Sequence, residues 1–472
     1  MKEKMTYADA LTNPVFKTIS RIASEVGMRA FVIGGFVRDY FLGIPNDDID
    51  IVVEGSGIEF AKHFSDAVGG SVQVYENFGT AMVKYGDQKV EFVGARKEHY
   101  ERGSRKPYCE TGTLHDDQLR RDFTINAMAF DLNEGHFGEL VDPFDGLQDL
   151  ADGIIRTPID PVQTFLDDPL RMLRAIRFKC KLSKPGKMFH VAIPTGEAIK
   201  NCKDEIRTLS WERITEELNK ILASRVPSNG FIWLSYTGLL DYILPEVSAL
   251  SMPGDKGHKN VFDHTMQVLD NVARESDDLY LRWAALLHDI GKVKTKKYVD
   301  GEGWTFHGHE KVGSRMVNKI FRRLHLPLDS RMEFVEKMVA MHMRPSKLAE
   351  EGVTDSAIRR LVFDAGDDID SLLTLAKCDV TTKYESKRQR VYNNLLIIEK
   401  HIKEVEEKDA IRNWKNPITG DYIMQTFGIG PCKTIAVLKD AVKDAILDGV
   451  IPNEFEAAEA FVKEKAKELG IV

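Results

Sequence analysis

Hydrophobic and polar positions follow two different patterns along this chain. Over the first 30 residues, apolar side chains recur at helical spacing, and the apolar run FVIGG that follows ends in a pair of glycines. Next come the β-branched run IDIVV, a helical stretch from Gly57 to Val68, and the strand-like pieces SVQVY, TAMVKY and KVEFVGA. This order predicts one small α/β or α+β domain over about residues 30–140. The apolar positions of the first helix are Leu11, Val15, Ile19, Ile22 and Val26.

From Asp160 to the end, the period of two almost disappears and helical patterns take its place. Examples are FLDDPLRMLRAIRF, LSWERITEELNKIL, HTMQVLDNVARE and KTIAVLKDAVKDAIL. The segment SALSMPGDKGHKN contains Pro, Gly and Ser, which indicates a boundary near residues 250–260, and we expect a second boundary near Asp379. The fold class predicted is therefore α+β, with a mixed head and an all-α remainder.

Composition narrows the class of protein. The 472 residues correspond to about three domains at roughly 150 residues each, and 43% hydrophobic with 29% charged residues exclude a disordered chain or a fibre. The chain contains 65 Lys and Arg and 73 Asp and Glu, so its net charge is −8. Any surface that binds nucleic acid must therefore be a local patch of positive charge. Five single cysteines without CxxC spacing argue against a disulfide framework or a zinc ribbon. Without a recognisable secretion signal or apolar span, we expect a cytoplasmic, soluble protein with no membrane contact and no obligate protein partner.

A glycine pair, an arginine and two carboxylates follow the first expected strand. They are Gly34, Gly35, Arg38, Asp48 and Asp50, the last two within the run NDDIDIVV. The period of a strand directs both carboxylates to one face, where they repel each other unless a cation lies between them. Mg²⁺ prefers such a pair completed by phosphates and water, and glycines let the backbone approach a triphosphate. Each feature alone also suits a tight turn or an acidic strand edge, but their joint order favours a nucleotide site.

Two arginine-rich motifs follow. Arg120 and Arg121 precede Asp122 and can hold triphosphate oxygens, although which of the two contacts phosphate stays open. Further on, Asp168, Arg171, Arg174 and Arg177 recur every three residues on an expected helix. Cytosine and adenine both present an amine beside a ring nitrogen acceptor, so a carboxylate and a guanidinium together select C and A over U and G. Ordinary i,i+3 ion pairs on a helix surface are the simpler alternative.

A set of histidines and aspartates is spread over the helical sequence that follows. Imidazole and carboxylate suit Mn²⁺, Ni²⁺, Co²⁺, Mg²⁺ or Fe, and a metal held by them can activate water against a phosphoester. A single buried histidine is usually a core residue, but six such residues in one region favour a metal centre. They are His264, His288, Asp289, His309, His342 and Asp379.

The head motifs carry a family resemblance. GGFVRDYFLGIPNDDIDIVV, RRDFTINAMAF, DPFDGLQDL, DDPLRMLRAIRF and LSWERITEELNKIL resemble, in order, the motifs of the class II tRNA nucleotidyltransferase and bacterial poly(A) polymerase family, over about residues 30–225. The resemblance implies a polymerase-β-like nucleotidyltransferase head followed by helical neck, body and tail, and Mg²⁺-dependent attack of an RNA 3′-hydroxyl on a nucleoside triphosphate. The expected parts are a head (1–155), a neck that binds RNA and nucleotide (156–255), an HD metal phosphohydrolase domain (256–380) and a helical tRNA-binding region (381–472).

The resemblance also assigns roles to residues. Asp48 and Asp50 become catalytic Mg²⁺ ligands, and Asp168 with Arg171 becomes the template that selects the base. Arg121, Asp122 and Asn126 are expected to contact the ribose and the triphosphate. Arg174 and Arg177 are expected either to lie nearer the phosphates or to have a structural role. Two positions depart from the family pattern, since Asp167 stands where Glu is usual and Asp145 where many relatives have glycine.

The later motifs VFDHTMQVLDNV, LLHDIGK, HGHEKVG, MHMRP and AKCDV resemble an HD-superfamily phosphohydrolase domain over about residues 258–380. The resemblance implies that one divalent transition metal is bound by His264, His288, Asp289 and Asp379. His309 and His342 are then available for a second metal or for substrate, and Lys292 for neutralising phosphate.

We therefore predict an enzyme that adds C, C and A to the 3′ end of tRNA from CTP and ATP, with possible HD phosphohydrolase activity. The loop GARKEHYERGSRKPYCETGT favours full CCA addition, because in the family such a loop distinguishes enzymes that switch from C to A. Alternatives are a poly(A) polymerase, an enzyme that adds only A, and, in another class, a metal phosphohydrolase whose head merely binds nucleotide or RNA. The absence of a basic tail argues against the first alternative, and intact Asp48 and Asp50 argue against the last.

Overall fold

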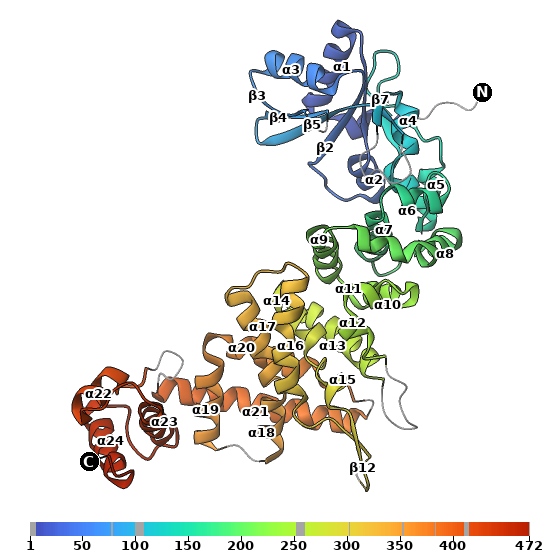
Figure 1. Cartoon of the computed structure of the whole chain (residues 1–472). Coiled ribbons are helices and arrows are strands. Elements are labelled where there is room, and N and C mark those ends of the chain that lie inside the picture. The colour runs from blue at the N-terminus through green and yellow to red at the C-terminus, as the bar shows by residue number, and fades with distance from the viewer. Residues whose placement is uncertain are drawn as a thin grey trace. The chain divides into compact units, whose positions relative to one another are not determined.

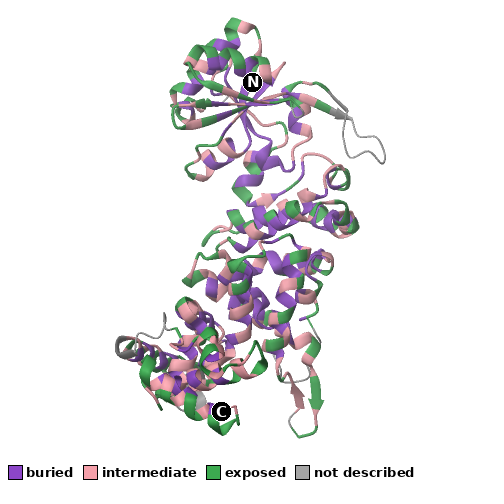
Figure 2. Cartoon of the chain, turned by 60° about the vertical axis from the view of Figure 1, so that its left-hand side comes forward, coloured by how far each residue is buried: buried purple, intermediate pink, exposed green. Residues whose placement is uncertain are grey.

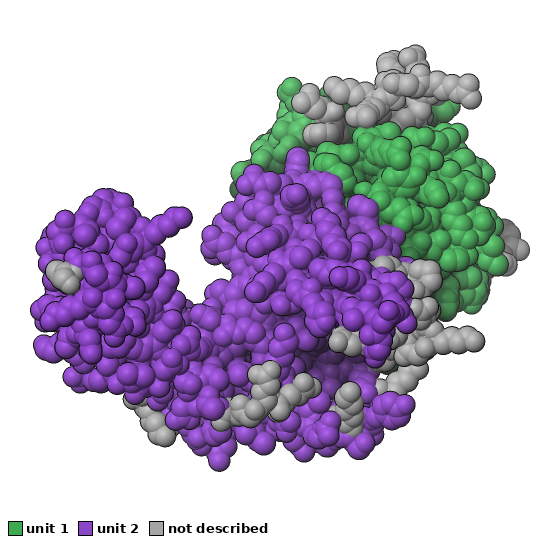
Figure 3. All heavy atoms as spheres, turned by 60° about the horizontal axis from the view of Figure 1, so that its bottom comes forward, with its two compact units in different colours: residues 1–224, 229–243 green, residues 225–228, 244–472 purple. Residues whose placement is uncertain are grey.

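The computed structural model describes residues 6–76, 79–99, 108–251, 260–301, 303–351, 354–382, 384–409 and 415–471. The chain divides into two compact units, one of residues 1–224 and 229–243 and the other of residues 225–228 and 244–472 (Figure 3). Every helix among the described residues is too short or too polar to cross a lipid bilayer. The tip of the loop expected to govern the switch from C to A, residues 100–107, lies outside the described residues.

A mixed sheet forms the centre of the first unit. Its seven strands among the described residues lie in the order β3-β4-β5-β2-β1-β8-β9, in which β2 and β5 are parallel and the other neighbours antiparallel. Strand β2, which begins beside the acidic pair, is therefore central, and it lies next to β1, which leads into the glycine pair. The strands are β1 (Arg29–Ile33), β2 (Ile49–Glu54), β3 (Ser71–Tyr75), β4 (Thr80–Tyr85), β5 (Gln88–Gly94), β8 (Ala129–Asp131) and β9 (Leu140–Val141).

Helices α1 (Pro14–Val26) and α3 (Gly57–Val68) pack against each other and against this sheet (Figure 1). Helix α1 starts where the Asn13 side chain accepts a hydrogen bond from the Val15 amide, and it ends at Gly27 in the left-handed conformation. Val15, Ile19 and Ile22 of the predicted apolar side are buried in α1 and Val26 is half-buried, whereas Leu11 is buried in a short 3-10 helix (Ala8–Leu11) that precedes α1. The predicted helix–strand alternation of the head is confirmed.

The rest of the first unit is mostly helical, but it also contains short strands. The elements are α2 (Gly35–Leu42), the hairpin β6 (Arg96–His99) and β7 (Tyr108–Thr111), α4 (Leu114–Leu119), α5 (Gly146–Asp152), β10 (Ile154–Ile155), α6 (Pro161–Asp167), α7 (Leu170–Leu182), β11 (His190–Val191), α8 (Ile193–Cys202), α9 (Trp211–Leu222), α10 (Ser228–Thr237) and α11 (Leu240–Ile243). Strand β11 pairs with β10, so the neck, which we expected to be all-α, also contains a short two-stranded sheet. Two-residue strands carry too few positions for a period of two to be visible.

The helix expected over FLDDPLRMLRAIRF is interrupted. Helix α6 ends at Asp167, Asp168 has extended backbone angles, and α7 begins at Leu170. The cause is Pro169, because a proline disfavours helical angles in the residue before it. Asp168 therefore lies in the junction between two helices rather than on one helical ridge with the arginines, which corrects the prediction.

The described residues of the second unit are helical apart from one small hairpin. Its elements are α12 (Pro245–Ser248), α13 (Val261–Glu275), α14 (Leu279–Leu287), α15 (Lys292–Thr295), β12 (Lys297–Val299), β13 (Gly303–Thr305), α16 (His309–Arg323), α17 (Ser330–Met341), α18 (Met343–Glu351), α19 (Asp355–Ala365), α20 (Ile369–Cys378), α21 (Glu385–Asp409), α22 (Gly420–Phe427), α23 (Lys433–Leu447) and α24 (Phe455–Glu468). Helices α22 to α24 enclose a hydrophobic cluster of their own, around Leu438 and Val442. Within each unit, buried residues gather along the sheet and along one side of the helices (Figure 2).

Candidate nucleotide site and candidate metal centre

The glycine turn after β1 lies against an arginine and an aspartate. Gly34 has φ 80° and ψ −124°, a backbone conformation that side-chain-bearing residues avoid. A Cβ atom built at Gly34 would lie 3.1 Å from Nη1 of Arg121 and 4.0 Å from Oδ2 of Asp50. The turn thus brings three of the predicted nucleotide-binding and metal-binding residues together, and a larger side chain at position 34 would displace the guanidinium.

The acidic pair stands at the start of β2 as the strand period predicts. Ile49 is buried between the exposed Asp48 and the half-buried Asp50. Burial raises the pKa of Asp50 to about 6; the charge of Arg121 opposes this rise, and that of Asp48 adds to it. A divalent cation would relieve the charge that Asp48 imposes on Asp50, so these residues fit Mg²⁺.

A buried carboxylate, which the sequence reasoning missed, holds the arginine pair. Asp117 has no solvent exposure, and its Oδ1 accepts hydrogen bonds from Arg120 while its Oδ2 accepts them from Arg121, at 2.5–3.1 Å. Burial raises the pKa of Asp117, but the two guanidinium groups outweigh that effect and the net shift is downward. Since Arg121 also extends toward Gly34, it is the arginine that faces both the glycine turn and Asp50. The i,i+3 and i,i+4 spacing in DDQLRRD is the signal that could have identified Asp117.

A second buried network joins three predicted residues to the helix after the junction. Arg38 donates from Nη1 to the Asn126 side chain (2.7 Å), and Asn126 donates to Oδ1 of Asp122 (3.0 Å). Arg174 on α7 donates from Nε to the other oxygen of Asp122 (2.8 Å). Arg38 is only 4% exposed and pairs with its neighbour Asp39, so it lies inside the network rather than at the surface of a cavity.

A cavity of about 410 Å³ is lined by six of the predicted residues, namely Asp50, Arg121, Asp122, Asp168, Arg171 and Arg174. Six arginines and four acids line it, which is a formal excess of positive charge suited to a polyanionic ligand. Arg177 is not on its wall, because it is buried and paired with Glu217 at 2.6 Å. The lining residues are Asp50, Val52, Thr80, Glu91, Val93, Arg96, Arg120, Arg121, Asp122, Asp168, Leu170, Arg171, Arg174 and Arg213.

The proposed base-reading residues meet in this cavity with a partner that the sequence reasoning did not single out. Arg213 on α9 contacts both carboxylate oxygens of Asp168, at 3.1 and 3.3 Å. Arg171 donates from Nη2 to the backbone carbonyl of Arg120 (2.6 Å), which links the two arginine motifs. The motif LSWERITEELNKIL contains Arg213, but its spacing alone does not reveal that the side chain reaches Asp168.

Asp145 has a left-handed backbone, with φ 54° and ψ 35°. The family resemblance led us to expect glycine at this position, and aspartate is one of the few other residues that tolerate such angles. The departure from the family pattern therefore keeps the backbone that glycine would adopt.

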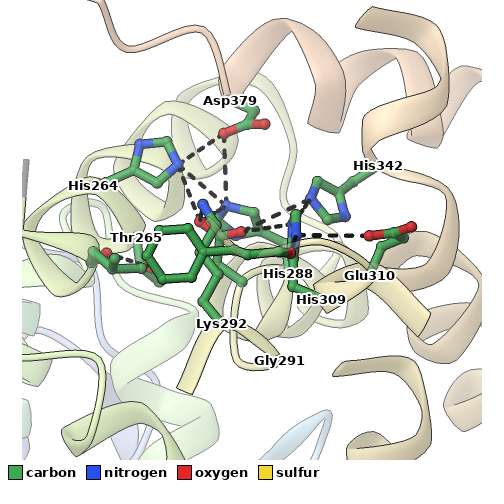
Figure 4. Close-up of polar contacts among 12 residues, drawn as sticks. His264, Thr265, His288, Gly291, Lys292, His309, Glu310, His342 and Asp379 are labelled. Atoms are coloured by element: carbon green, nitrogen blue, oxygen red, sulfur yellow. Dashed lines mark hydrogen bonds and ion pairs between the residues drawn. The ribbon is translucent and has the colours of Figure 1, made fainter. Parts of the chain in front are cut away.

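The histidines and aspartates of the second unit converge on one centre (Figure 4). Asp289 lies in the middle, and its two oxygens face two different groups. Oδ2 lies 3.5 Å from Nε2 of His264 and 3.3 Å from Nε2 of His288, while Oδ1 lies 3.3 Å from Nε2 of His309 and 3.9 Å from Nε2 of His342. The donors therefore form two clusters that share one carboxylate.

Asp379 completes the first cluster, with Oδ1 2.9 Å from Nε2 of His264 and 3.6 Å from Nε2 of His288. Donor atoms of each cluster lie close enough to hold one ion, so the residues fit two metals as well as the single-metal arrangement predicted from the sequence. The structure adds that Asp289 belongs to both groups.

The unused ring nitrogen of each histidine is held in place. Nδ1 of His288, His309 and His342 lies 2.8–2.9 Å from a backbone carbonyl, and Nδ1 of His264 lies 2.8 Å from the Thr381 hydroxyl. Such contacts direct Nε2 toward the centre and fix the tautomer that binds metal. Burial also lowers the pKa of His342 to about 4, which keeps that imidazole neutral.

Two further residues shape the metal centre. Lys292 contacts Oδ2 of Asp289 at 2.6 Å, so the predicted phosphate-neutralising lysine lies beside a metal-ligand candidate. A Cβ atom at Gly291 would lie 2.0 Å from the carbonyl oxygen of His309, because the chain after α14 passes directly against the start of α16. Glycine at position 291 is what allows this approach.

Comparison with protein families matches three successive segments. Residues 30–156 match the poly A polymerase head domain, residues 188–250 the probable RNA and SrmB-binding site of polymerase A, and residues 261–380 the HD domain. An A-adding tRNA nucleotidyltransferase of Deinococcus radiodurans is 30% identical over 93% of this chain and 96% of its own. A multifunctional CCA protein of Laribacter hongkongensis is 33% identical over 81% of this chain and 92% of its own.

Solved structures agree with the fold. A CCA-adding enzyme in an apo form matches with a TM-score of 0.64 and 26% identity, covering 98% of this chain and 97% of its own. The chain spans 30%, 54% and 26% of the A-adding relatives from Geobacter sulfurreducens, Halalkalibacterium halodurans and Aquifex aeolicus. The chain belongs to the tRNA nucleotidyltransferase and poly(A) polymerase family, a family of enzymes, and carries its head, RNA-binding and HD modules in order. The predicted family and fold class are confirmed.

Proposed function

We propose that this protein adds C, C and A to the 3′ end of tRNA, using CTP and ATP. The observation that carries the proposal is that Asp168 and Arg171, the pair suited to reading C and A, line the same cavity as Asp50 and Arg121. Base selection and triphosphate binding would therefore share one site, as an enzyme that copies no nucleic-acid template requires. Such a role would place the protein in the cytoplasm.

Different residues of the head would bind the triphosphate, select the base and hold Mg²⁺. Arg121, oriented by Asp117, would bind triphosphate oxygens next to the Gly34 turn. Asp168 would accept a hydrogen bond from the exocyclic amine of C or A, and Arg171 would donate to the ring nitrogen. Asp48 and Asp50 would hold Mg²⁺, which when bound neutralises phosphate charge and makes the 3′-hydroxyl more acidic. The Asp122–Arg174 ion pair would keep the head motif in register with α7.

A second candidate is addition of A alone to tRNAs that already end in CC. The relative from Deinococcus radiodurans, matched along almost the whole of both chains, is named an A-adding enzyme. The multifunctional CCA protein supports full addition at a similar level of identity. The product made from defined tRNA ends distinguishes the two activities.

The test is to incubate the protein and Mg²⁺ with tRNA transcripts that end at the discriminator base, at C or at CC, with CTP, ATP or both, and to sequence the products. Addition of CCA and no more to the shortest transcript is the expected result. Extension of the CC end alone would identify an A-adding enzyme, and long A tracts a poly(A) polymerase. No extension, with an Asp50→Asn variant as the inactive reference, would refute a nucleotidyltransferase.

We further propose that the HD centre is a divalent-metal phosphohydrolase site. Six imidazole and carboxylate donors, four of them with their second ring nitrogen already engaged, support this assignment. Hydrolysis of bis(p-nitrophenyl) phosphate with added Mn²⁺, Co²⁺ or Ni²⁺ tests it. Asp289→Asn should remove the activity, whereas Asp440→Asn, an exposed aspartate on α23, should retain it. Equal rates in both variants would contradict the proposal.

The proposed division of the chain remains a head (1–155), a neck (156–255), an HD domain (256–380) and a tRNA-binding region (381–472). Its support is that each of the three matched segments falls almost wholly within one of these parts. Limited proteolysis with mapped fragment ends would test the boundaries.

A further inference from the structure

A second cavity, of about 490 Å³, lies in the second unit among α13, α20 and α21. This volume is typical of pockets for small ligands, roughly 300–1,000 Å³. None of the six metal-ligand candidates is among its lining residues, so it is separate from the HD centre. The concavity between three helices suits a small molecule better than a polymer, which would need an extended surface.

The charge of the cavity favours an anion. Arg274 on α13, Lys377 on α20 and Arg388 on α21 all line it, against a single acid, Glu275. Because each cation comes from a different helix, the three groups surround the space instead of forming one stripe. Convergent cations of this kind are typical of phosphate recognition.

The present partners of these cations do not prevent binding. Lys377 pairs with Glu399 and Arg388 with Glu385, each at 2.6 Å, and both acids are solvent-accessible. The Arg388–Glu385 pair is exposed and contributes little stability, so a dianionic phosphate can replace it, whereas Lys377 is partly buried and would turn from Glu399 toward the phosphate. Arg274 donates to the Asn271 side chain at 2.9 Å.

The remaining wall suits a planar, polar group. Tyr392 is 41% exposed and offers a ring face on which a base can stack. Gln389 and Thr374 add amide and hydroxyl groups able to bond to the edge of such a base. Phosphate-binding cations together with an aromatic face and hydrogen-bonding groups define the chemistry of a nucleotide.

The cavity also shares a wall with the metal centre. Cys378 and Val380 line it on either side of Asp379, which faces the metal centre. Asn271 donates from Nδ2 to the carbonyl of Cys378 at 2.8 Å, so one side chain joins Arg274 to the segment that carries Asp379. A ligand here would lie directly behind the HD centre.

We propose that this cavity is a second nucleotide-binding site, selective for nucleoside phosphates and independent of the site in the head. Its phosphate lies among Arg274, Lys377 and Arg388, and its base lies on Tyr392. The site needs neither the metals of the HD centre nor the proposed tRNA activity in order to bind.

Photoaffinity labelling of the full-length protein tests this assignment. The probe is 8-azidoadenosine 5′-monophosphate, which lacks the pyrophosphate leaving group and so cannot be incorporated by the head. After irradiation, we expect label on the α21 peptide that contains Tyr392, suppressed by excess AMP. Arg388→Ala should reduce this label at least fivefold, whereas Arg390→Ala, on the same helix but not on the cavity wall, should leave it unchanged.

Labelling of head peptides alone would overturn the proposal, and so would equal labelling in both arginine variants. Displacement of the label by tRNA but not by AMP would show that the cavity is part of an RNA surface and would equally refute a nucleotide site. Circular dichroism of both variants distinguishes lost binding from lost folding, and Lys377→Ala supplies an independent second cation to remove.

Discussion

At the scale of single residues, the site in the head depends on carboxylates that form ion pairs with arginines. Asp117 is buried beneath Arg120 and Arg121, and Asp168 is engaged by Arg213 across the cavity. The two acids differ in exposure, because Asp117 is fully enclosed while the Asp168 side chain is 30% exposed. Asp117 is therefore a positioning residue, whereas Asp168 can exchange its partner for a base.

Replacing Asp117 with Asn should weaken nucleotide binding more than it slows turnover, since Arg121 would lose its orientation while the metal-ligand candidates stay in place. Breaking a buried ion pair also costs about 3 kcal/mol of the free energy of unfolding. The measurements are KM and kcat for ATP, together with urea unfolding. Asp116→Asn is the control, because this neighbour caps α4 at the surface. An unchanged KM would contradict a positioning role.

Replacing Asp168 with Ala should relax base choice. Without the carboxylate, the exocyclic amine of C or A loses its acceptor, and we expect discrimination against UTP and GTP to fall at least about tenfold. The ratio of kcat/KM values for the four nucleotides measures this, with Mg²⁺ dependence as a second readout that should not move. Glu216→Ala, an exposed acid on α9, is the matched control. Retained selectivity in Asp168→Ala would refute the template role.

Residue types and spacing predicted many of the residues in the site, but they did not predict which side chains form ion pairs with them. The period of a strand correctly places Ile49 inward beside Asp50. Arg213 was missed because its role arises from a contact between separate elements, and Arg38 and Arg177 lie off the cavity wall for the same reason. The partners of Asp117 are local, but spacing alone does not show that this acid is buried beneath both arginines.

At the scale of elements, a break between two helices positions the site in the head, and the close approach of two chain segments positions the metal centre. Pro169 separates α6 from α7 and places Asp168 in the junction, where its carboxylate reaches the cavity. Gly291 lets the chain after α14 contact the start of α16, which brings His288 and Asp289 toward His309. Helical periodicity predicted these helices, but it did not predict the break at Asp168 or the two-residue strands, because both depend on single residues or on distant pairing.

A methyl group at position 291 should therefore damage the second unit. Gly291→Ala places Cβ against the His309 carbonyl, and overpacking of this kind costs about 1–3 kcal/mol. Thermal unfolding of the full chain and retention of added Mn²⁺ are the measurements. Gly420→Ala is the control, because its Cβ would meet only Ile435 at 3.6 Å, an ordinary contact. Equal stability of the two variants would contradict the packing argument.

At the scale of the whole molecule, the two candidate sites belong to two compact units. The cavity of the head lies within residues 1–224 and 229–243, and the metal centre lies within residues 225–228 and 244–472. The family and the order of its modules could be recognised from the sequence because each motif is short and local. The division into units could not, because it depends on contacts between segments distant in sequence.

Because the two sites lie in separate units, we expect a substitution in one site to leave the properties of the other unchanged. Asp50→Asn should abolish extension of tRNA while leaving the metal content of the HD centre unchanged, and Asp289→Asn should do the reverse. Metal content by mass spectrometry and tRNA extension, measured on the same preparations, test this. If either variant lost both properties while remaining folded by circular dichroism, the two sites would not be independent.

The carboxylate of Asp289 has one more consequence, which concerns how such a centre can change over generations. His309 and His342 serve one cluster only, so a substitution at either leaves a complete set of donors in the other. Asp289 faces both clusters through its two oxygens. Loss of this one residue removes a donor from both clusters in a single step, so a decaying HD module would keep only His264, His288 and Asp379 grouped as candidate ligands.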